Sequence, residues 1–496
     1  MILALLFAAF ILAITFVFYW YLSVPKNLPP GPKGLPLIGS VLDTWDTPKQ
    51  YLLLQEWAKK YGPLFKVYVA NKMVLILADY KIIQEALVKQ GDVFAGRPQV
   101  MKLVPKKYWE YGIFLTEGEI WKEQRRFAIT TLREFGLGKS SLEPHIQEEV
   151  EHLTNELAKH ADGPGFNLHR IVNNAVANVI CQLVFGRRFE YDDPAFGKQL
   201  MVLTRRAAES NISFLSPLLL CGWVAKTLSL LPAAKRLLSE GAQFVNYIDE
   251  QCQITAKNYD LSTPPTNYVA AFAKASKEQE GTSFHNEQLV STVIDLFAAG
   301  TETASSAIRW GVLYLARMPD LQDKIYQELH EGMSGDVNNN KLPSYADRGR
   351  FPLTEATLME VQRIGSLSPL SVIHKTLAPT KLMGYDIPEG TLAIPLLWNV
   401  LSDPETFPNP EKFDPYRFID EQGKVKRNPN LIPFSAGKRV CIGEGLAWME
   451  LFIFFAGIFS RFRFFFPPNE PIPTLAAGVG FVRAPTPFNI CVEERK

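Results

Sequence analysis

The sequence predicts a mainly helical domain with a minor β portion, an α+β fold, carried on a membrane anchor. Three observations support this. Hydrophobic residues make up 47% of the 496 residues and aromatic residues 12%, which is enough apolar surface for a large core. Most of the chain shows helical periodicity, and strand-like runs are few and short. The first 24 residues carry no charge.

The uncharged segment 1–24 predicts a single N-terminal transmembrane anchor. A helix of this length spans the roughly 30 Å hydrocarbon core of a bilayer. An aromatic cluster near its end is typical of the membrane interface: Phe16, Phe18, Tyr19, Trp20 and Tyr21. The first cations, Lys26 and Lys33, follow the span, which favours a cytosolic location for the rest of the chain.

Residues 25–40, PKNLPPGPKGLPLIGS, predict a proline-rich hinge that holds the folded part away from the membrane. Residues 41–496 then form one domain, because no internal repeat or low-complexity linker divides them. A second apolar stretch at 212–232 is interrupted by Pro217, Gly222 and Lys226. It is consistent with a surface dip into the bilayer or with a buried helix pair, and the pattern does not separate the two.

Within the domain, LFKVYVA and MVLILA, residues 64–70 and 73–78, predict a β-hairpin. Helical periodicity predicts helices over 141–160, 285–317 and 316–330. The middle one is about 50 Å long at 1.5 Å per residue and nearly uncharged at its centre, so it runs through the interior. Residues 331–350 predict a polar loop, and short strands follow residue 375.

The net charge of +1 disfavours nucleic acid as a partner. Five scattered cysteines without a CxxC pair suit a reducing compartment.

One of them, Cys441 in PFSAGKRVCIGE, precedes an apolar helix candidate and lies between Gly437 and Gly443. Cations and helix amide groups stabilise a thiolate, and glycines let the backbone approach a flat partner against which Phe434 packs. Such a thiolate suits an axial ligand of haem iron, although a plain buried cysteine is the alternative.

The full pattern Phe434-x-x-Gly437-x-Arg439-x-Cys441-x-Gly443 resembles the haem-binding signature of the cytochrome P450 family. The segments NLPPGPKGLPLIG, FAGRP, FLTEGEIWKEQRRF and DLFAAGTETASSAIRW resemble animal microsomal members of the family-two type. Trp448 departs from those relatives, which often carry arginine there. The resemblance implies the cytochrome P450 fold, with haem b buried between the long central helix and the cysteine loop and helix, and Cys441 as the iron ligand.

The resemblance also implies roles for other residues. Donors to the haem propionates are Arg97, Trp121, Arg125, His374 and Arg439. Glu302 and Thr303 match an acid and alcohol pair that relays protons for O–O bond cleavage, and Ala299 and Gly300 let the helix pass close to the haem. A buried structural cluster comprises Glu360, Arg363 and Arg417. Candidates for the substrate pocket are Phe114, Leu296, Ala299, Thr303, Leu367 and Leu370.

The implied function is a membrane-bound haem-thiolate monooxygenase of the endoplasmic reticulum. It hydroxylates or epoxidises lipophilic small molecules (fatty acids, steroids or xenobiotics) with O₂ and NADPH-derived electrons. Because the sequence carries no flavin or iron–sulfur motif, electrons must come from an NADPH-cytochrome reductase, with cytochrome b5 as a possible second donor. Two alternatives stay open: a reductase-independent haem-thiolate isomerase acting on a lipid peroxide, and a non-enzymatic haem- or lipid-binding membrane protein.

Overall fold

The computed structural model describes residues 15, 27–35, 39–40, 49–69, 72–98, 105–137, 140–209, 232–278, 283–333, 342–478 and 480–495. Apart from Thr15, the predicted anchor at 1–24 lies outside these residues, as does nearly all of the apolar stretch 212–232. In the part of the chain that is described, no helix is both long and apolar enough to cross a membrane.

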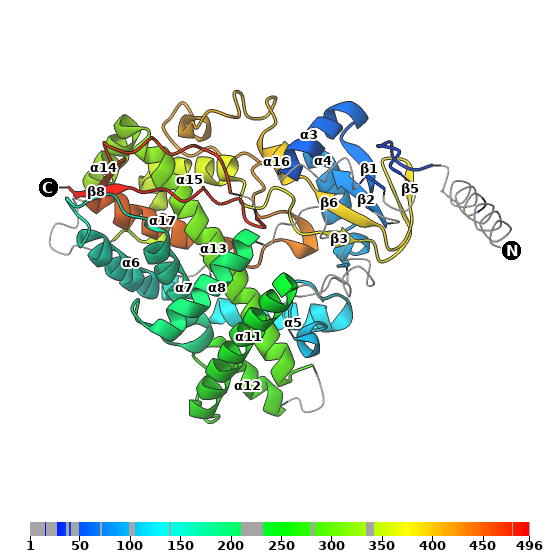
Figure 1. Cartoon of the computed structure of the whole chain (residues 1–496), viewed down its shortest axis with the longest axis horizontal. Coiled ribbons are helices and arrows are strands. Elements are labelled where there is room, and N and C mark those ends of the chain that lie inside the picture. The colour runs from blue at the N-terminus through cyan, green and yellow to red at the C-terminus, as the bar shows by residue number, and fades with distance from the viewer. Residues whose placement is uncertain are drawn as a thin grey trace.

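Helices form most of the molecule; most of the strands gather at one end of it, and the strand Cys491–Glu494 lies at the opposite end (Figure 1). The longer helices are α3 (Gln50–Tyr61), α5 (Gly118–Glu134), α6 (Glu143–Ala158), α7 (His169–Phe185), α8 (Pro194–Glu209), α11 (Pro232–Asn258), α12 (Tyr268–Glu278), α13 (Asn286–Ala316), α14 (Pro319–Met333), α15 (Pro352–Gly365) and α17 (Glu444–Arg461). Two short helices are α4 (Tyr80–Ile83) and α16 (Leu397–Leu401). The predicted mainly helical fold with a minor β portion is confirmed.

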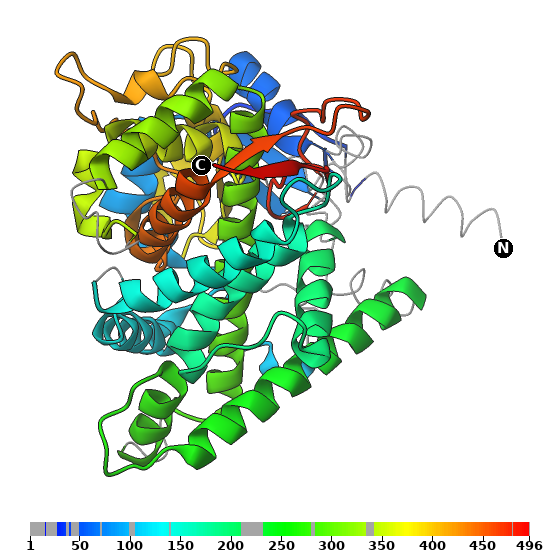
Figure 2. The ribbon, with the colours of Figure 1, turned by 90° about the vertical axis from the view of Figure 1, so that its left-hand side faces the viewer.

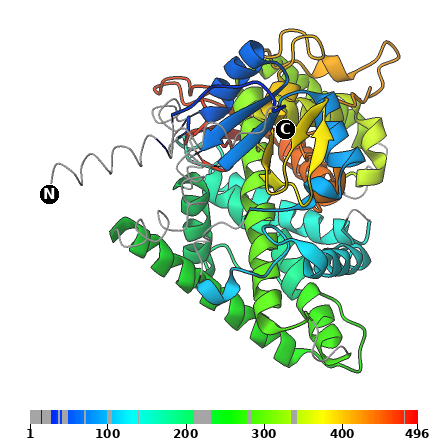
Figure 3. The same cartoon turned by 90° about the vertical axis from the view of Figure 1, so that its right-hand side faces the viewer.

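The larger sheet has four strands in the order β1-β2-β6-β3. Strands β1 (Leu64–Val69) and β2 (Lys72–Leu77) form the predicted antiparallel hairpin, with Val67 opposite Val74. β2 then pairs in parallel with β6 (Leu392–Pro395), a strand far away in sequence (Figure 3). β3 (His374–Lys375) closes the sheet against β6. The short pairs β4 (Thr380–Leu382) with β5 (Tyr385–Ile387), and β7 (Phe462–Phe465) with β8 (Cys491–Glu494), complete the β portion.

The described part of the proline-rich segment packs on this sheet. The carbonyl oxygen of Pro30 accepts the backbone N–H of Lys66 at 2.8 Å, and the N–H of Ser40 donates to the oxygen of Tyr68 at 2.7 Å. Pro30 and Ser40 are therefore held along β1 by backbone hydrogen bonds.

The core surrounds α13, which runs through the middle of the molecule between α7 and α17 (Figure 1). Gly311 allows a close approach, since a Cβ there would lie 2.0 Å from the ring of Phe455 on α17. Gly457 on α17 does the same toward Val150 on α6. The long helix α11 forms an outer edge of the molecule (Figure 2). The predicted helices at 141–160, 285–317 and 316–330 match α6, α13 and α14 within three residues at each end.

The loop predicted over 331–350 is only partly a loop. α14 continues to Met333, and residues Tyr345–Arg350 form a 3-10 helix started by Ser344, whose side chain accepts the N–H of Ala346. The serine cap supplies a local acceptor that polarity alone does not reveal.

Candidate active site

The segment before Cys441 is a tight loop. The N–H of Cys441 donates to the carbonyl oxygen of Phe434 at 3.1 Å, and a 3-10 turn, Gly437–Arg439, lies inside the loop. Gly437 has φ 77°, and a Cβ there would lie 1.8 Å from the oxygen of Leu87, so only glycine fits. The predicted need for glycine therefore comes from the neighbouring helical turn at 84–89. Phe434 packs edge-to-face on Trp448, with ring centroids 5.6 Å apart.

The side chain of Cys441 is accessible although its loop is packed on the core. Burial is the main cause that raises the pKa of the Cys441 thiol, and Glu444 adds to it, while the N–H of Gly443 and Arg125 oppose the shift. The free side chain is thus a neutral thiol. In the free side chain, desolvation therefore outweighs the stabilising effect of Arg125 and the N–H of Gly443.

The middle of α13 is exposed on one face. Ala298 and Ala299 are accessible, whereas Thr301, Glu302 and most residues from there to Leu315 are buried. An interior helix is accessible at its centre only where an open space borders it, so α13 borders such a space at these alanines. Thr303 donates its hydroxyl hydrogen to the oxygen of Ala299 at 2.7 Å, the i−4 bond that the sequence predicts.

Gly300 lies at a close contact between two helices. A Cβ at this position would lie 2.5 Å from Cδ1 of Ile180, so the glycine lets α13 approach α7. The residue next to Ala299 is therefore small because of helix packing.

Glu302 lies among polar partners on the α7 side of α13. Its carboxylate pairs with Arg309 at 2.8 Å and lies 3.5 Å from both His169 Nε2 and Asn173 Nδ2. Burial raises the pKa of Glu302. The opposing effects of His169, Arg309 and Asn173 together are larger, so the net shift of the pKa is downward. Among the described residues, no hydrogen bond joins Glu302 to Thr303.

Four of the predicted propionate donors lie together near the Cys441 loop. Arg439 stacks on the ring of Trp121 at 3.4 Å and donates to the oxygens of Ala95 and Thr116 at 2.8 and 2.5 Å. Arg97 donates to the oxygen of Ile373 at 2.9 Å. His374 Nδ1 donates to the oxygen of Phe94 at 2.8 Å.

The fifth donor, Arg125, contacts the loop itself by donating to the oxygen of Val440 at 2.5 Å. Burial and the nearby Arg125 lower the pKa of Arg97 to about 9, and burial, Arg97 and Arg125 lower that of Arg439 to about 8. Burial and the two arginines Arg97 and Arg439 also lower the pKa of His374, so its ring is neutral. These cations repel one another.

The cation cluster (Arg97, Trp121, Arg125, His374 and Arg439) lacks an anionic partner of its own. Within the described chain, none of its three guanidinium groups pairs with a carboxylate within 4 Å. The indole N–H of Trp121 is buried and has no hydrogen-bond partner. Buried donors of this kind are normally satisfied, so the cluster calls for an anion or acceptor beyond the side chains described.

The predicted structural cluster is assembled and buried. Arg363 donates two hydrogen bonds of 2.7 Å to the two carboxylate oxygens of Glu360, in the bidentate geometry. Arg417 lies 3.3 Å from the same carboxylate. Arg363 also donates to the oxygens of Leu401 and Pro410, which ties α15 to the irregular stretch before the cysteine.

The predicted pocket residues come from three regions. Leu296, Ala299 and Thr303 share α13, and Leu296 and Leu367 are partly buried against the main core. Leu370 packs instead against the cluster around β1 and β6. Phe114 lies edge-to-face with Phe481, with ring centroids 6.1 Å apart.

Two acidic residues on core helices were not predicted from the sequence. Asp295, on the apolar part of α13, accepts two backbone N–H groups. Glu450, on α17, is 2% exposed, and its Oε1 has no hydrogen-bond partner. An acid directly flanked by apolar residues was the available signal in both cases.

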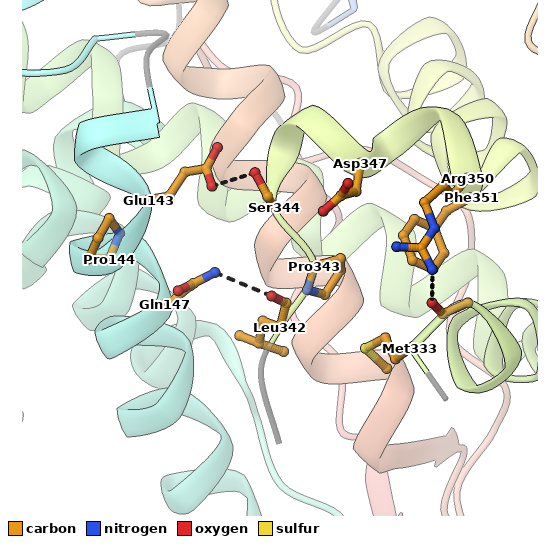
Figure 4. A pocket seen from close by; sticks show the side chains of 11 residues that line it. Glu143, Pro144, Gln147, Met333, Leu342, Pro343, Ser344, Asp347, Arg350 and Phe351 are labelled. Carbon is orange, nitrogen blue, oxygen red and sulfur yellow. Dashed lines mark hydrogen bonds between the residues drawn. The ribbon is translucent and has the colours of Figure 1, made fainter. Parts of the chain in front are cut away.

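One pocket lies elsewhere, between the start of α6 and the end of α14 (Figure 4). Its polar groups are satisfied locally: Ser344 donates to Glu143 at 2.8 Å, and Arg350 donates to the oxygen of Gly332 at 2.6 Å. None of the predicted site residues lines it. The candidate site is therefore the region of Cys441, α13 and the cation cluster.

Comparison with known proteins agrees with this geometry. The family model "Cytochrome P450" matches residues 29–492. The chain is 36% identical to cytochrome P450 2U1 of Rattus norvegicus, covering 95% of this chain and 91% of that protein. It is 37% identical to cytochrome P450 2J1 of Oryctolagus cuniculus over 97% and 95%, and 38% identical to cytochrome P450 2H1 of Gallus gallus over 88% and 87%.

Both the family match and these relatives extend over nearly the whole chain, and the relatives exceed one third identity. Members of this family are monooxygenases that use haem b with a cysteine thiolate as axial ligand. The chain belongs to the cytochrome P450 family and is a haem-thiolate monooxygenase.

Proposed function

We propose that this monooxygenase is anchored in the endoplasmic reticulum membrane by residues 1–24, with its catalytic domain in the cytosol. There it hydroxylates or epoxidises lipophilic small molecules such as fatty acids, steroids or xenobiotics. The observation that carries the proposal is the unpaired cation cluster beside an accessible Cys441 thiol, because together they match a dianionic cofactor with a thiolate-bound metal.

The residues present fit haem b. Its two propionates supply the anions that Arg97, Arg125 and Arg439 lack, and an acceptor for the indole N–H of Trp121. Cys441 is the iron ligand in this proposal, and iron binding overcomes the raised pKa of its thiol. Phe434 and Gly443 border the ligand, since a Cβ at Gly443 would lie 3.9 Å from the Cys441 sulfur.

Bound in this way, haem supplies the activation of O₂ for insertion of one oxygen atom into a C–H or C=C bond. The chain's own residues hold and shield the reacting groups. The accessible face of α13 at Ala298 and Ala299 leaves room for O₂ and substrate. Leu296, Leu367 and Phe114 offer apolar contacts around that room, which favours a lipophilic substrate.

Thr303 and Glu302 are proposed to deliver protons. The Thr303 hydroxyl, bonded to the oxygen of Ala299, lies at the accessible face and can pass on a proton there. The net effect of its partners lowers the pKa of Glu302 and holds it ionised, so it gives up readily any proton that it takes on, and His169 at 3.5 Å is a partly exposed neighbour. A rotation of the Glu302 side chain away from Arg309 is needed for it to reach Thr303.

The proposed electron donors are an NADPH-cytochrome reductase and cytochrome b5. Exposed cations near the cysteine loop support docking of an acidic partner: Lys122, Arg126 and Arg133 on α5, and Lys424, Lys426, Arg427 and Lys438. Arg439 does not belong to this surface because it is buried in the cation cluster. Lys122 and Lys438 form surface ion pairs with Glu119 and Asp92.

Turnover assays test this function. Purified protein is incubated with a panel of fatty acids, steroids and aromatic xenobiotics, with NADPH and a microsomal reductase. We expect oxygenated products only when the reductase and O₂ are present. Products formed from a lipid hydroperoxide without reductase would instead favour an isomerase, and bound haem without turnover in either assay would favour a carrier.

The docking surface has its own test. Charge reversal at Lys122 and Arg133 should slow reduction by the reductase and flatten the dependence of that rate on salt. Reversal at Lys235, an exposed cation on α11, is the control. Unchanged reduction kinetics in the Lys122→Glu, Arg133→Glu variant would contradict docking at this surface.

A further inference from the structure

The segment 108–116, which leads into α5, is held against α13 by a row of polar side chains. Gln288, Ser291 and Asp295 recur at spacings of three and four residues, so they lie along one side of α13. Each of them contacts the backbone of this segment. Polar groups on an otherwise apolar, buried helix need such partners.

Asp295 makes the tightest of these contacts. Its Oδ2 accepts the backbone N–H of Ile113 at 2.7 Å and that of Phe114 at 3.0 Å. A carboxylate that accepts two backbone donors fixes the direction of both peptide units. The backbone from which the Phe114 side chain projects is thus set by one oxygen atom.

Gln288 fixes the residue just before. Its side-chain oxygen accepts the N–H of Gly112 at 3.1 Å, and its amide donates to the oxygen of the same glycine at 3.4 Å. Gly112 has φ 94°, and a Cβ there would lie 2.3 Å from Oδ2 of Asp295. Only glycine permits this approach of the segment to α13.

The carbonyl oxygens of the same segment face the cation cluster. Arg97 donates to the oxygen of Phe114 at 3.3 Å, and Arg439 donates to those of Ile113 and Thr116 at 3.5 and 2.5 Å. The segment is therefore held from both sides, by acceptors on α13 and by donors of the cation cluster. Phe114 is held through its N–H by Asp295 and through its carbonyl oxygen by Arg97. Its ring packs edge-to-face on the ring of Phe481.

We propose that Asp295 is a positioning residue that sets which part of a substrate meets the haem, by fixing the backbone of Phe114 through its two N–H groups. The inference rests on the proposed haem site and deepens it. It assigns a selectivity role to a residue outside the predicted set of pocket residues, and it predicts that the effect passes through Phe114.

The test uses probes that bind haem iron through a nitrogen, so that it does not depend on knowing the substrate. Imidazole is small, whereas 4-phenylimidazole extends a ring from the iron toward the pocket wall. Both are titrated into the haem-loaded full-length protein, and the dissociation constant of each is read from the Soret shift. The measured quantity is the ratio of the two constants.

In Asp295→Ala we expect this ratio to change at least fivefold, with the constant for imidazole within twofold of the unsubstituted protein. Asp295→Asn keeps an oxygen that can accept the same N–H groups, so it should return the ratio toward the starting value. In a Phe114→Ala background, Asp295→Ala should no longer change the ratio. A merely structural role would alter both probes alike in every background.

The matched control is Asp249→Asn. This carboxylate, on α11, accepts the hydroxyl of Tyr108 at 3.4 Å and so touches the same segment without holding Phe114. The ratio should stay within twofold. If Asp295→Ala does not retain haem, Gln288→Ala takes its place, with the same change in ratio expected.

A ratio that stays within twofold in Asp295→Ala, or in Gln288→Ala where that replaces it, would overturn the proposal. So would an effect that persists in the Phe114→Ala background. If imidazole produces no Soret shift in the unsubstituted protein, the haem site itself has failed, which is a different result.

Discussion

At the scale of single residues, Cys441 and Glu450 are ionisable groups that share the direction of their pKa shift but have opposite roles. Burial raises the pKa of both side chains. Cys441 is accessible and lies beside Arg125 and the N–H of Gly443, so a metal ion can bind its sulfur atom. Glu450 has no such neighbour among the causes of its shift, and burial alone keeps its carboxyl group neutral.

Glu450 therefore makes stability depend on pH. Its pKa is raised on folding, so at neutral pH the unfolded chain is ionised and the folded chain is not, which costs stability. That cost shrinks as pH falls from neutrality toward the ordinary glutamate range near 4.5, with a slope of at most about 1.4 kcal/mol per pH unit.

We expect Glu450→Gln to melt at the same or a higher temperature at pH 7 and to lose part of the rise in stability between pH 7 and 5. Melting curves of the haem-loaded protein across this range measure it. Glu493→Gln, at an exposed position on β8, is the control. Equal pH dependence in Glu450→Gln and the unsubstituted protein would mean that Glu450 is ionised in the fold.

The sequence predicted the roles of single residues that match a known motif. It did not predict contacts that arise only from packing in the tertiary structure. The family resemblance implied which donors serve one site, and the cation cluster is assembled from positions as distant as Arg97 and Arg439. It could not predict the partners of Gly300 or Gly437, because Ile180 and Leu87 come close only in the tertiary structure. It also did not predict the role of Asp295, which depends on a contact with Phe114, 181 residues away in the sequence.

At the scale of elements, the structure depends on joints between helices where small or charged side chains permit only one arrangement. The cluster of Glu360, Arg363 and Arg417 is one such joint, since it ties α15 to the stretch that leads to Cys441. The sequence predicted this joint from a family resemblance, because an i, i+3 pair alone is usually a solvated surface contact. Burial of Glu360 and Arg363 makes it different.

Removing the charge of Glu360 should be costly. Glu360→Gln leaves two guanidinium groups without their carboxylate, and we expect a loss of about 3–5 kcal/mol in the free energy of unfolding. Denaturant unfolding followed by haem absorbance measures it. The control is Glu355→Gln on the same helix, whose carboxylate pairs with Arg348 at 3.6 Å near the surface and should cost less than about 1 kcal/mol. Similar losses in both variants would contradict a buried joint.

The contact between α13 and α17 is a second joint. Gly311→Ala places a Cβ 2.0 Å from the Phe455 ring, and overpacking of this kind costs about 1–3 kcal/mol. Gly197→Ala on α8 meets nothing within 4 Å and should be neutral or stabilising. The melting temperatures of the two variants measure these effects. An unchanged melting temperature in Gly311→Ala would show that the two helices can separate without a loss of stability.

At the scale of the whole molecule, the candidate site draws on parts of the chain that are far apart. Arg97 follows the first hairpin, Trp121 and Arg125 lie on α5, His374 starts β3 and Arg439 precedes α17. The helices and the hairpin were predictable from periodicity, whereas the parallel pairing of β2 with β6 and the polar row on α13 were not, because they join distant segments. The fold brings five hydrogen-bond donors from four regions of the chain together. We infer that an anionic group binds between them.

Apoprotein should therefore discriminate between haem and haem dimethyl ester, in which both propionates are neutralised. We expect at least about tenfold weaker binding of the ester, since each hydrogen bond to a charged group contributes about 1.5–3 kcal/mol. Arg97→Leu should narrow the difference, whereas Arg170→Leu, on α7, should not. Equal affinity for haem and its ester would show that the cluster does not bind the carboxylates.

The central claim is that Cys441 holds haem iron as its thiolate ligand at this site. The most direct measurement is the absorption spectrum of the reduced protein with CO. We predict a Soret band shifted to the red by thiolate ligation. The band should be lost in Cys441→Ala and unaffected in Cys491→Ala, the control at a buried cysteine of β8. Persistence of the red-shifted band in Cys441→Ala would contradict the account.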